Sequence, residues 1–329
     1  MSSVWIIVLF GLSLGLTGAY RRYALTRRIL DIPNQRSAHD TPVPRGGGVV
    51  FVGLFLAVIG WFVPQNLMLF GWILGIAVLG YIDDKRPIAA HIRFIVHIIL
   101  GTGALMALGG MPDITILRWT CHFNAWTAGI GVVFLVWMLN LYNFMDGING
   151  LAGFEAICAT LGMAVIYHLV QVPNEVQLLL VLAAVVAGFL IWNFPVAKLF
   201  MGDAGSGFLG LTLGIWTLQS AHFQPQLFWC WLIMLGVFIV DASLTILRRI
   251  QRKQRIHIAH SSHAYQHAAR HFGAHWHVTL GVVLLNGIWL WPLSLLVSLG
   301  YLPGLLGLMI AYIPLIFLAC YFKAGFPSS

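Results

Sequence analysis

Long apolar stretches, each ended by charged residues or by clusters of Pro, Gly and Asn, follow one another along almost the whole chain. A helix crosses the hydrocarbon core of a bilayer with about 20 predominantly apolar residues, within a range of about 17–25. The pattern therefore predicts an all-α polytopic membrane protein with ten or eleven transmembrane helices, in which residues 1–329 form a single integral membrane domain. The predicted helices are 4–20, 46–63, 66–82, 91–109, 124–142, 151–170, 175–192, 205–221, 226–247, 277–299 and 302–322.

The composition supports this interpretation. Hydrophobic residues make up 60% of the 329 residues and charged residues only 9%, whereas soluble globular proteins are about 45–50% apolar and about 25% charged. Too few charges remain to cover a water-exposed surface. A soluble enzyme, a disordered chain, a collagen and a coiled coil are therefore excluded.

Basic residues are concentrated in alternate loops. Of the 18 Lys and Arg residues, 16 fall in one set of loops and only Arg118 falls in the other. Because cytoplasmic loops carry such an excess, we expect the N-terminus outside the cell and the C-terminus in the cytoplasm. The net charge of +8 then reflects topology, and nucleic-acid binding is not expected because the aromatic residues lie in apolar stretches.

Most of the aspartates fall in the same cytoplasmic loops, and Asp83 with Asp84 forms the first candidate site. Adjacent carboxylates repel one another unless positive charge lies close by. A divalent cation with a preference for oxygen ligands would supply that charge. The alternative is a solvated helix end whose charges are screened by Lys85 and Arg86.

The second candidate is a stripe of polar side chains near the end of the predicted helix 124–142. Four amide or carboxylate side chains recur every three residues, a spacing that follows one helix face until glycines interrupt it, and a structural helix end would need only one of them as a cap. They are Asn140, Asn143, Asp146 and Asn149.

The third candidate is the segment from Asn193 to Gly207, in which glycines flank Asp203. Glycine allows a ligand to approach the backbone closely, and the free N–H groups of the helix that follows suit an anion. An ordinary turn with Asp203 as the helix N-cap is the alternative.

Two further loops carry candidate binding residues. The predicted cytoplasmic loop 248–276 is basic and rich in histidine, and we weigh three uses for it: phosphate binding, zinc binding by His260 and His263, and contact with lipid headgroups. The loop 31–48 combines prolines, Arg45 and a glycine triplet, which suits close approach to a ligand. Carboxylates for magnesium and basic groups for phosphate, on one face of the membrane, favour phosphoryl transfer between a soluble donor and a lipid acceptor.

Four motifs in this order resemble the polyprenyl-phosphate N-acetylhexosamine-1-phosphate transferase family. They are Asp83-Asp84, the segment Asn143-Phe-Met-Asp-Gly-Ile-Asn-Gly-Leu-Ala152, the segment Asn193-Phe-Pro-Val-Ala-Lys-Leu-Phe-Met-Gly-Asp-Ala-Gly-Ser206, and His260-Ser-Ser-His-Ala-Tyr-Gln266. The loop Asp31–Gly48 looks most like the bacterial branch that begins O-antigen or related surface polysaccharides. The resemblance covers almost the whole chain, from about Arg21 to the end of the histidine loop.

This resemblance implies an enzyme of the bacterial inner membrane. It would transfer a sugar-1-phosphate from a UDP-N-acetylhexosamine to undecaprenyl phosphate, release UMP, and begin lipopolysaccharide or related synthesis. It would use magnesium, with manganese as an alternative ion. Membrane lipids are further expected partners, and a homodimer is a further expectation.

The resemblance also implies roles for individual residues. Asp203 looks like the principal magnesium ligand with Asn143 beside it, and His260 and His263 resemble the histidines that hold the diphosphate. Phe200 would stack on uracil. The remaining assignments are catalytic roles for Asp83, Asp84 and Asp146, and substrate contacts from Asn193, Asn149 and Arg45.

Two positions depart from the family pattern. Asn149 stands where the family usually has Asp, and Ser261 stands where it often has Arg, a charge that Arg255 or Arg270 would have to supply. A transporter of an anionic substrate is the main alternative function. It would carry ionisable residues at mid-membrane, whereas the charges here collect at one face.

Overall fold

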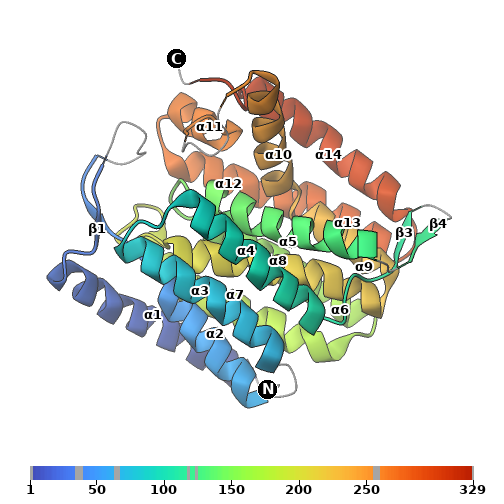
Figure 1. Ribbon diagram of the computed structural model, residues 1–329, viewed down its shortest axis with the longest axis horizontal. Coiled ribbons are helices and arrows are strands. Elements are labelled where there is room, and N and C mark those ends of the chain that lie inside the picture. Colours follow the sequence, from blue (N-terminus) through green and yellow to red (C-terminus); the bar gives the residue numbers. More distant parts are fainter. Residues whose placement is uncertain are drawn as a thin grey trace.

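The computed structural model describes residues 3–33, 40–62, 67–116, 119–122, 125–254 and 260–327. Long helices pack side by side in one bundle, with the N-terminus at one end and the C-terminus at the other (Figure 1). The first half contains α1 (Ser3–Thr26), β1 (Leu30–Asp31), β2 (Val43–Pro44), α2 (Gly48–Phe62), α3 (Leu67–Lys85), α4 (Ala90–Ala107), β3 (Ile114–Ile116), β4 (Trp119–Cys121) and α5 (Ala125–Met145). The second half contains α6 (Leu151–Leu169), α7 (Pro173–Asn193), α8 (Asp203–Phe223), α9 (Pro225–Met234), α10 (Gly236–Gln251), α11 (Ala264–Phe272), α12 (His275–Leu285), the π-helical turn η2 (Asn286–Leu290), α13 (Trp291–Ser298) and α14 (Gly304–Tyr321).

The helices confirm an all-α polytopic membrane protein. Within the described residues, eight helical segments are long and apolar enough to cross a membrane, or nine if the bent pair α9 and α10 forms one span. The helix α2 is apolar but has only 15 residues. The expected number of ten or eleven crossings therefore stays a prediction.

Two predicted elements differ from the structure. The span expected over 226–247 is broken, because α9 and α10 meet at Leu235 with a bend of 70°. Gly236 opens α10, where a Cβ atom would lie 3.0 Å from the ring of Tyr312 in α14, so glycine permits close packing at the bend. The expected loop 248–276 is also partly helical, since α10 continues to Gln251 and α11 lies within it.

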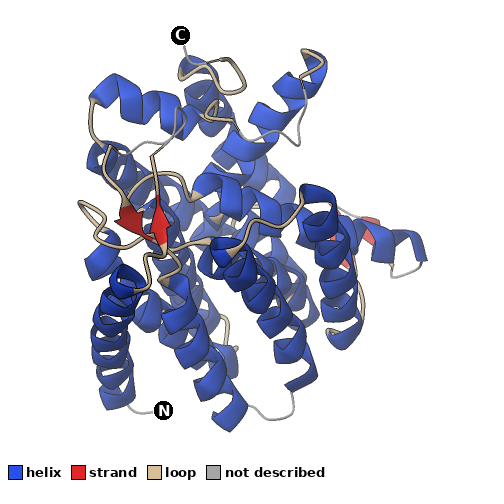
Figure 2. Cartoon of the chain, turned by 60° about the vertical axis from the view of Figure 1, so that its left-hand side comes forward, coloured by secondary structure: helices blue, strands red, loops and turns tan. Residues whose placement is uncertain are grey.

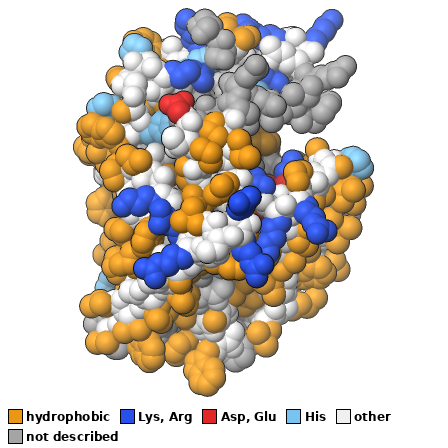
Figure 3. Space-filling model, turned by 90° about the vertical axis from the view of Figure 1, so that its left-hand side faces the viewer, with side chains coloured by type: hydrophobic (Ala, Val, Ile, Leu, Met, Phe, Trp, Pro, Cys, Tyr) orange, Lys and Arg blue, Asp and Glu red, His pale blue; other side chains and the backbone are white. Residues whose placement is uncertain are grey.

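The surface is largely apolar along the bundle. Large hydrophobic side chains such as Ile7, Trp61 and Phe317 are 71%, 82% and 72% exposed, which is stable only against lipid. On the face shown in Figure 3, hydrophobic side chains cover the lower part and Lys and Arg side chains gather above it.

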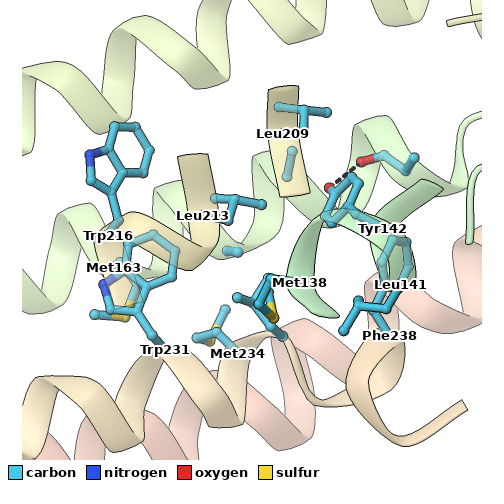
Figure 4. Close-up of a cluster of buried hydrophobic side chains, with 14 of the residues drawn as sticks. Met138, Leu141, Tyr142, Met163, Leu209, Leu213, Trp216, Trp231, Met234 and Phe238 are labelled. Atoms are coloured by element: carbon cyan, nitrogen blue, oxygen red, sulfur yellow. Dashed lines mark hydrogen bonds between the residues drawn. The ribbon is translucent and has the colours of Figure 1, made fainter. Parts of the chain in front are cut away.

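The core centres on α8, which is buried along nearly its whole length. Met138 and Tyr142 of α5 pack beside Leu209 and Leu213 of α8, and Trp231 of α9 lies in the same cluster (Figure 4). A Cβ at Gly210 of α8 would lie 2.7 Å from the Met138 carbonyl oxygen. This close packing of α8 against α5 brings the start of α8 next to the end of α5.

The short hairpin of β1 and β2 lies across one side of the bundle (Figure 2). Leu30 pairs with Pro44 and Asp31 with Val43. Directly after β2, Gly47 donates a backbone hydrogen bond to Phe200 and Gly48 donates one to Met201. The hairpin therefore holds the segment before α8 against the start of α2.

Candidate active site at the helix ends

An acidic cluster forms where the ends of α3 and α5 meet the starts of α4 and α8. Arg93 of α4 donates to the Asp83 carboxylate at 2.5 Å and approaches the Asp203 carboxylate at 3.3 Å. Asn143 of α5 donates to Asp203 at 2.9 Å and to the hydroxyl of Ser206 at 3.0 Å. Four helices thus bring together three of the predicted residues, Asp83, Asp203 and Asn143.

Asp84 caps the start of α8 from a neighbouring helix. Its two carboxylate oxygens accept backbone hydrogen bonds from Asp203 at 3.1 Å and from Ala204 at 3.3 Å. A negative charge at this position also interacts favourably with the helix dipole. Since both oxygens are engaged and Asp84 is 4% exposed, the geometry gives it a positioning role, and its catalytic role stays a prediction.

The glycines of this region allow neighbouring helices to approach the backbone closely, and the expected approach of a ligand stays a prediction. A Cβ at Gly80 would collide with the peptide group of Asp203, and a Cβ at Gly48 would collide with the backbone of Gly205. Gly202 has φ of 78°, and a Cβ there would lie 2.5 Å from the Asp84 carboxylate. Of the N–H groups at the start of α8, those of Asp203 and Ala204 donate to Asp84, and those of Gly205 and Ser206 donate to the Gly202 carbonyl.

Asp146 lies in the turn between α5 and α6, and its side chain is only half-buried. Its carboxylate accepts no hydrogen bond from the part of the chain that the structure describes. Desolvation by burial, together with the negative charges of Asp203 and Asp84, raises the pKa of Asp146 well above its usual range. This carboxylate therefore favours a proton or another positive partner.

The predicted stripe along α5 does not hold together as one helix face. The helix ends at Met145, so Asp146 and Asn149 lie beyond it. Asn140 donates instead to the backbone of Val136 in its own helix at 2.7 Å. Of the four polar side chains, only Asn143 makes a direct hydrogen bond to Asp203.

Asn193 and Asn149 connect the turn after α5 to the segment before α8. Asn193, which is 4% exposed, accepts from the Gly150 N–H at 2.8 Å and donates to the Leu199 carbonyl at 3.0 Å. Asn149 donates through its amide to the Pro195 carbonyl at 3.2 Å. Both amides thus act on protein backbone, and their predicted substrate contacts stay predictions.

Phe200 and Arg45 lie on the hairpin side of the cluster. The Phe200 N–H donates to the Pro44 carbonyl at 2.8 Å, and its side chain is half-buried. Arg45 donates through its guanidinium to the Asp84 carbonyl. Arg45 therefore contacts the same helix end as the acidic cluster.

The two predicted histidines lie together before α11. Their rings stack with centroids 5.0 Å apart, and Phe144 lies 6.1 Å from the ring of His263. Nδ1 of His260 is 2.9 Å from the Ser262 hydroxyl, and Nδ1 of His263 is 3.3 Å from Asp241. Burial lowers the pKa of His260 to about 3, and electrostatic interactions with His263 and Arg249 act in the same direction.

Asp241 of α10 caps the start of α11, as Asp84 caps the start of α8. It accepts backbone hydrogen bonds from Ala264 and Tyr265, each at 2.9 Å. Tyr265 in turn donates through its hydroxyl to the Phe144 carbonyl at 2.9 Å. This chain of contacts holds the histidines beside the end of α5.

Arg270 lies next to Ser261, the position where the family often has Arg. Arg270 donates to the Ser261 carbonyl at 3.0 Å, so a guanidinium lies beside this position. The other expected source, Arg255, lies outside the described residues.

From the sequence, Arg93 and Asp241 are charged residues near predicted helix ends, where snorkelling or pairing explains a charge. The structure shows that both contact predicted site residues. The available signal was their position on the same membrane face as the aspartates. Arg93 and Asp83 are ten residues apart, but Arg93 and Asp203 are 110 apart and Asp241 and His263 are 22 apart. No local spacing indicates these two longer contacts.

The acidic cluster fits a divalent cation. A positive group, the guanidinium of Arg93, already lies between Asp83 and Asp203, and the nearby donors are carboxylate oxygens. Among the described residues, no group of three His, Cys, Asp or Glu side chains is arranged as a closed metal cage. Magnesium does not require one, because it is commonly held by one or two carboxylates together with substrate phosphates.

Comparisons with known proteins indicate the family of this chain. Residues 66–221 match the family described as glycosyl transferase family 4. The chain is 32% identical over 83% of its length to a probable undecaprenyl-phosphate N-acetylglucosaminyl 1-phosphate transferase of Bacillus subtilis, covering 78% of that protein. It is 30% identical over 67% of its length to an undecaprenyl-phosphate alpha-N-acetylglucosaminyl 1-phosphate transferase of Yersinia pestis, covering 62% of it.

A third relative has the same name as the Yersinia pestis protein. The chain is 27% identical to the undecaprenyl-phosphate alpha-N-acetylglucosaminyl 1-phosphate transferase of Thermotoga maritima, over 80% of both chains. The fold and the relatives together define a class, the multi-pass membrane phosphotransferases. Within this class, the chain belongs to the polyprenyl-phosphate N-acetylhexosamine-1-phosphate transferase family. The transporter alternative finds no support in these matches.

Proposed function

We propose that the protein transfers an N-acetylhexosamine-1-phosphate from its UDP-sugar to undecaprenyl phosphate in the bacterial inner membrane. An oxygen of the lipid phosphate forms a bond to the phosphorus that carries the sugar. The bond from that phosphorus to the bridging oxygen breaks, and UMP leaves with this oxygen. The product is an undecaprenyl diphosphate sugar, the first intermediate of an O-antigen or related surface polysaccharide.

The observation that carries this proposal is the meeting of Asp83, Asp203, Asn143 and Arg93 at one end of the bundle. Asp203 and Asp83 would hold magnesium, and Asn143 orients Asp203 through its amide hydrogen bond. Magnesium would neutralise charge on the diphosphate and so make UMP a better leaving group. Manganese, with similar oxygen ligands, would substitute for it.

The other predicted residues take their proposed roles around this cluster. Asp146, whose carboxylate has no hydrogen bond from the described residues, would contact the donor or the metal. Phe200 would stack on uracil. His260 and His263 would donate hydrogen bonds to the diphosphate.

The cytoplasmic side is the proposed location of the reaction. The basic loops and the acidic cluster lie at the end of the bundle opposite the N-terminus, which favours an outside N-terminus and a cytoplasmic C-terminus. A C-terminal fusion to a reporter that works only in the cytoplasm should then be active. Activity of a C-terminal reporter that works only outside the cytoplasm would refute this orientation.

The test of function uses the purified protein with undecaprenyl phosphate and a panel of UDP-sugars, with lipid products resolved by mass. We expect one UDP-N-acetylhexosamine to yield a lipid whose mass has increased by one sugar phosphate. Asp203→Asn, or excess chelator, should abolish most of the turnover. Equal activity in wild-type protein and Asp203→Asn would refute the assigned site.

A further inference from the structure

A groove separate from the acidic cluster opens between α11 and the chain that follows α14. It has a volume of about 630 Å³, within the range of pockets that bind small ligands. The groove lies beside the C-terminal end of the bundle, where α11 approaches the end of α14 (Figure 1). The residues that line the groove include His267, Arg270, His271, Tyr321, Lys323 and Phe326.

The charged side chains described in the lining of this groove are basic. Arg270 and Lys323 line it, and Arg248 and Arg252 lie behind it around the ring of Phe326, at 5.5 and 3.5 Å from the centroid. No Asp or Glu is present among its described lining residues. Asp241 interacts electrostatically with His267 but has both carboxylate oxygens engaged by backbone N–H groups of α11. The four basic side chains therefore favour an anion, and guanidinium groups suit phosphate oxygens.

The same groove lies at a membrane boundary. The helix α14 is apolar enough to cross a membrane and ends at Tyr321, whose side chain is 72% exposed. Nearby on α11, Phe272 is 51% exposed and packs against Phe322. Exposed aromatic residues at the end of a span are typical of the lipid headgroup level.

We propose that this groove binds the phosphate headgroup of an anionic phospholipid. Basic pockets between transmembrane helices on the cytoplasmic side bind such headgroups. A free phosphate has the same chemistry, but it would not use the aromatic residues that face the bilayer. The phospholipid is therefore the ligand that accounts for both the charges and the aromatic residues.

A lipid bound here would also act on the histidine segment. In the chain after α14, Gly325 donates to the Ser262 carbonyl at 2.8 Å, and the Phe326 carbonyl lies 3.1 Å from Nε2 of His267. Ser262 in turn contacts His260. A headgroup that joins Lys323 to Arg270 would hold this segment on α11 and keep the histidines in place.

Binding can be measured without turnover, so the result does not depend on the proposed function. Full-length protein in a neutral detergent is titrated with phosphatidylglycerol or with phosphatidylcholine, and retained lipid is counted by native mass spectrometry. We expect preferential retention of phosphatidylglycerol. Lys323→Gln, whose side chain is exposed and makes no described hydrogen bond, should weaken this retention about fivefold, as expected for one cation near an anionic lipid surface.

A matched control removes cations elsewhere on the surface. Arg22→Gln combined with Arg27→Gln, exposed residues near the end of α1 and directly after it, should change retention less than twofold. Arg270→Gln serves as a second groove variant, with its thermal midpoint measured because the Ser261 hydrogen bond is also lost.

Three outcomes would overturn the proposal. The first is equal retention of the two phospholipids, and the second is equal loss in the groove variant and in the α1 control. The third is displacement of phosphatidylglycerol by inorganic phosphate at equal concentration, which would make the groove a site for soluble phosphate.

Discussion

Side chains in and around the acidic cluster differ in how many of their hydrogen-bonding atoms are already bonded to protein groups. Asp84 and Asn193 are buried and bonded to backbone groups, so their removal disturbs the site indirectly. Asp146 is half-buried and accepts no hydrogen bond from the described residues, so it is open to substrate. A side chain whose hydrogen-bonding atoms are unoccupied is the better candidate for direct contact with substrate.

His260 should act as a neutral hydrogen-bonding group. Because its pKa is lowered to about 3, it carries no charge above that pH, and its state does not change between pH 6 and 8. The value of kcat/KM for the donor reports ionisations in the free enzyme and substrate. We therefore expect the ratio of kcat/KM between wild-type protein and His260→Gln to stay constant from pH 6 to 8. A ratio that falls as pH rises through 6–7 would show that a charged imidazole binds the diphosphate.

Asn149, which stands where the family usually has Asp, should position the donor and not act as a catalytic base. Its amide donates to the Pro195 carbonyl, and a carboxylate in its place would face that oxygen without a proton to share. We expect Asn149→Asp to raise the KM for the donor severalfold without raising kcat, as measured by steady-state kinetics with the true donor. A rise in kcat of about tenfold, or about 1.4 kcal/mol off the barrier, with KM unchanged, would indicate a catalytic base instead.

At the scale of elements, two helices that begin at the site are capped by aspartates from other helices. Asp84 of α3 caps α8, and Asp241 of α10 caps α11. The Asp84 cap joins helices that are distant in sequence, and the Asp241 cap joins two consecutive helices across a loop. A predicted functional residue lies at or just before the start of each capped helix, Asp203 for α8 and His263 for α11. Helix capping therefore sets the geometry of the site.

The cap on α8 predicts a combined loss of stability and activity. Asp84→Asn removes the negative charge at the helix start and replaces one acceptor by a donor that faces an N–H group. We expect a loss of about 1–2 kcal/mol in stability together with most of the activity, from thermal unfolding and product formation. Unchanged stability with lost activity would instead assign Asp84 a direct catalytic role.

A buried polar pair joins α6 to the π-helical turn. Asn286 donates to one carboxylate oxygen of Glu155 at 2.7 Å, while the other oxygen of Glu155 and the amide oxygen of Asn286 have no partner among the described residues. A proton on Glu155 would turn its unpartnered oxygen into a hydrogen-bond donor. Glu155→Gln should therefore be tolerated, because its amide can donate in place of that proton.

Glu155→Leu is the matched comparison, since it leaves Asn286 without its partner at a cost of about 1–3 kcal/mol. Thermal midpoints of both variants in the same detergent test this pair. If Gln destabilises as strongly as Leu, the carboxyl is ionised in the folded protein.

For the whole molecule, the sequence predicted the class of fold well and its tertiary contacts poorly. Long apolar stretches indicate membrane helices by length alone, so the starts and ends of α3, α6 and α7 lie within a few residues of prediction. The bend at Leu235 and the helix α11 depend on packing against α14 and on the Asp241 cap, contacts that no local pattern reveals. The glycines near Asp203 were recognised as sites of close approach, but only the structure shows that other helices make that approach.

The central claim is that the enzyme moves a sugar together with its phosphate. It is tested most directly with a UDP-N-acetylhexosamine whose sugar-bearing phosphate is isotopically labelled, incubated with the purified protein, undecaprenyl phosphate and magnesium. The account predicts that the label appears in the lipid product and that an equal amount of unlabelled UMP is released, with both signals lost in Asp203→Asn. Label recovered in released UDP, with an unlabelled lipid product, would show transfer of the sugar alone and would contradict the account.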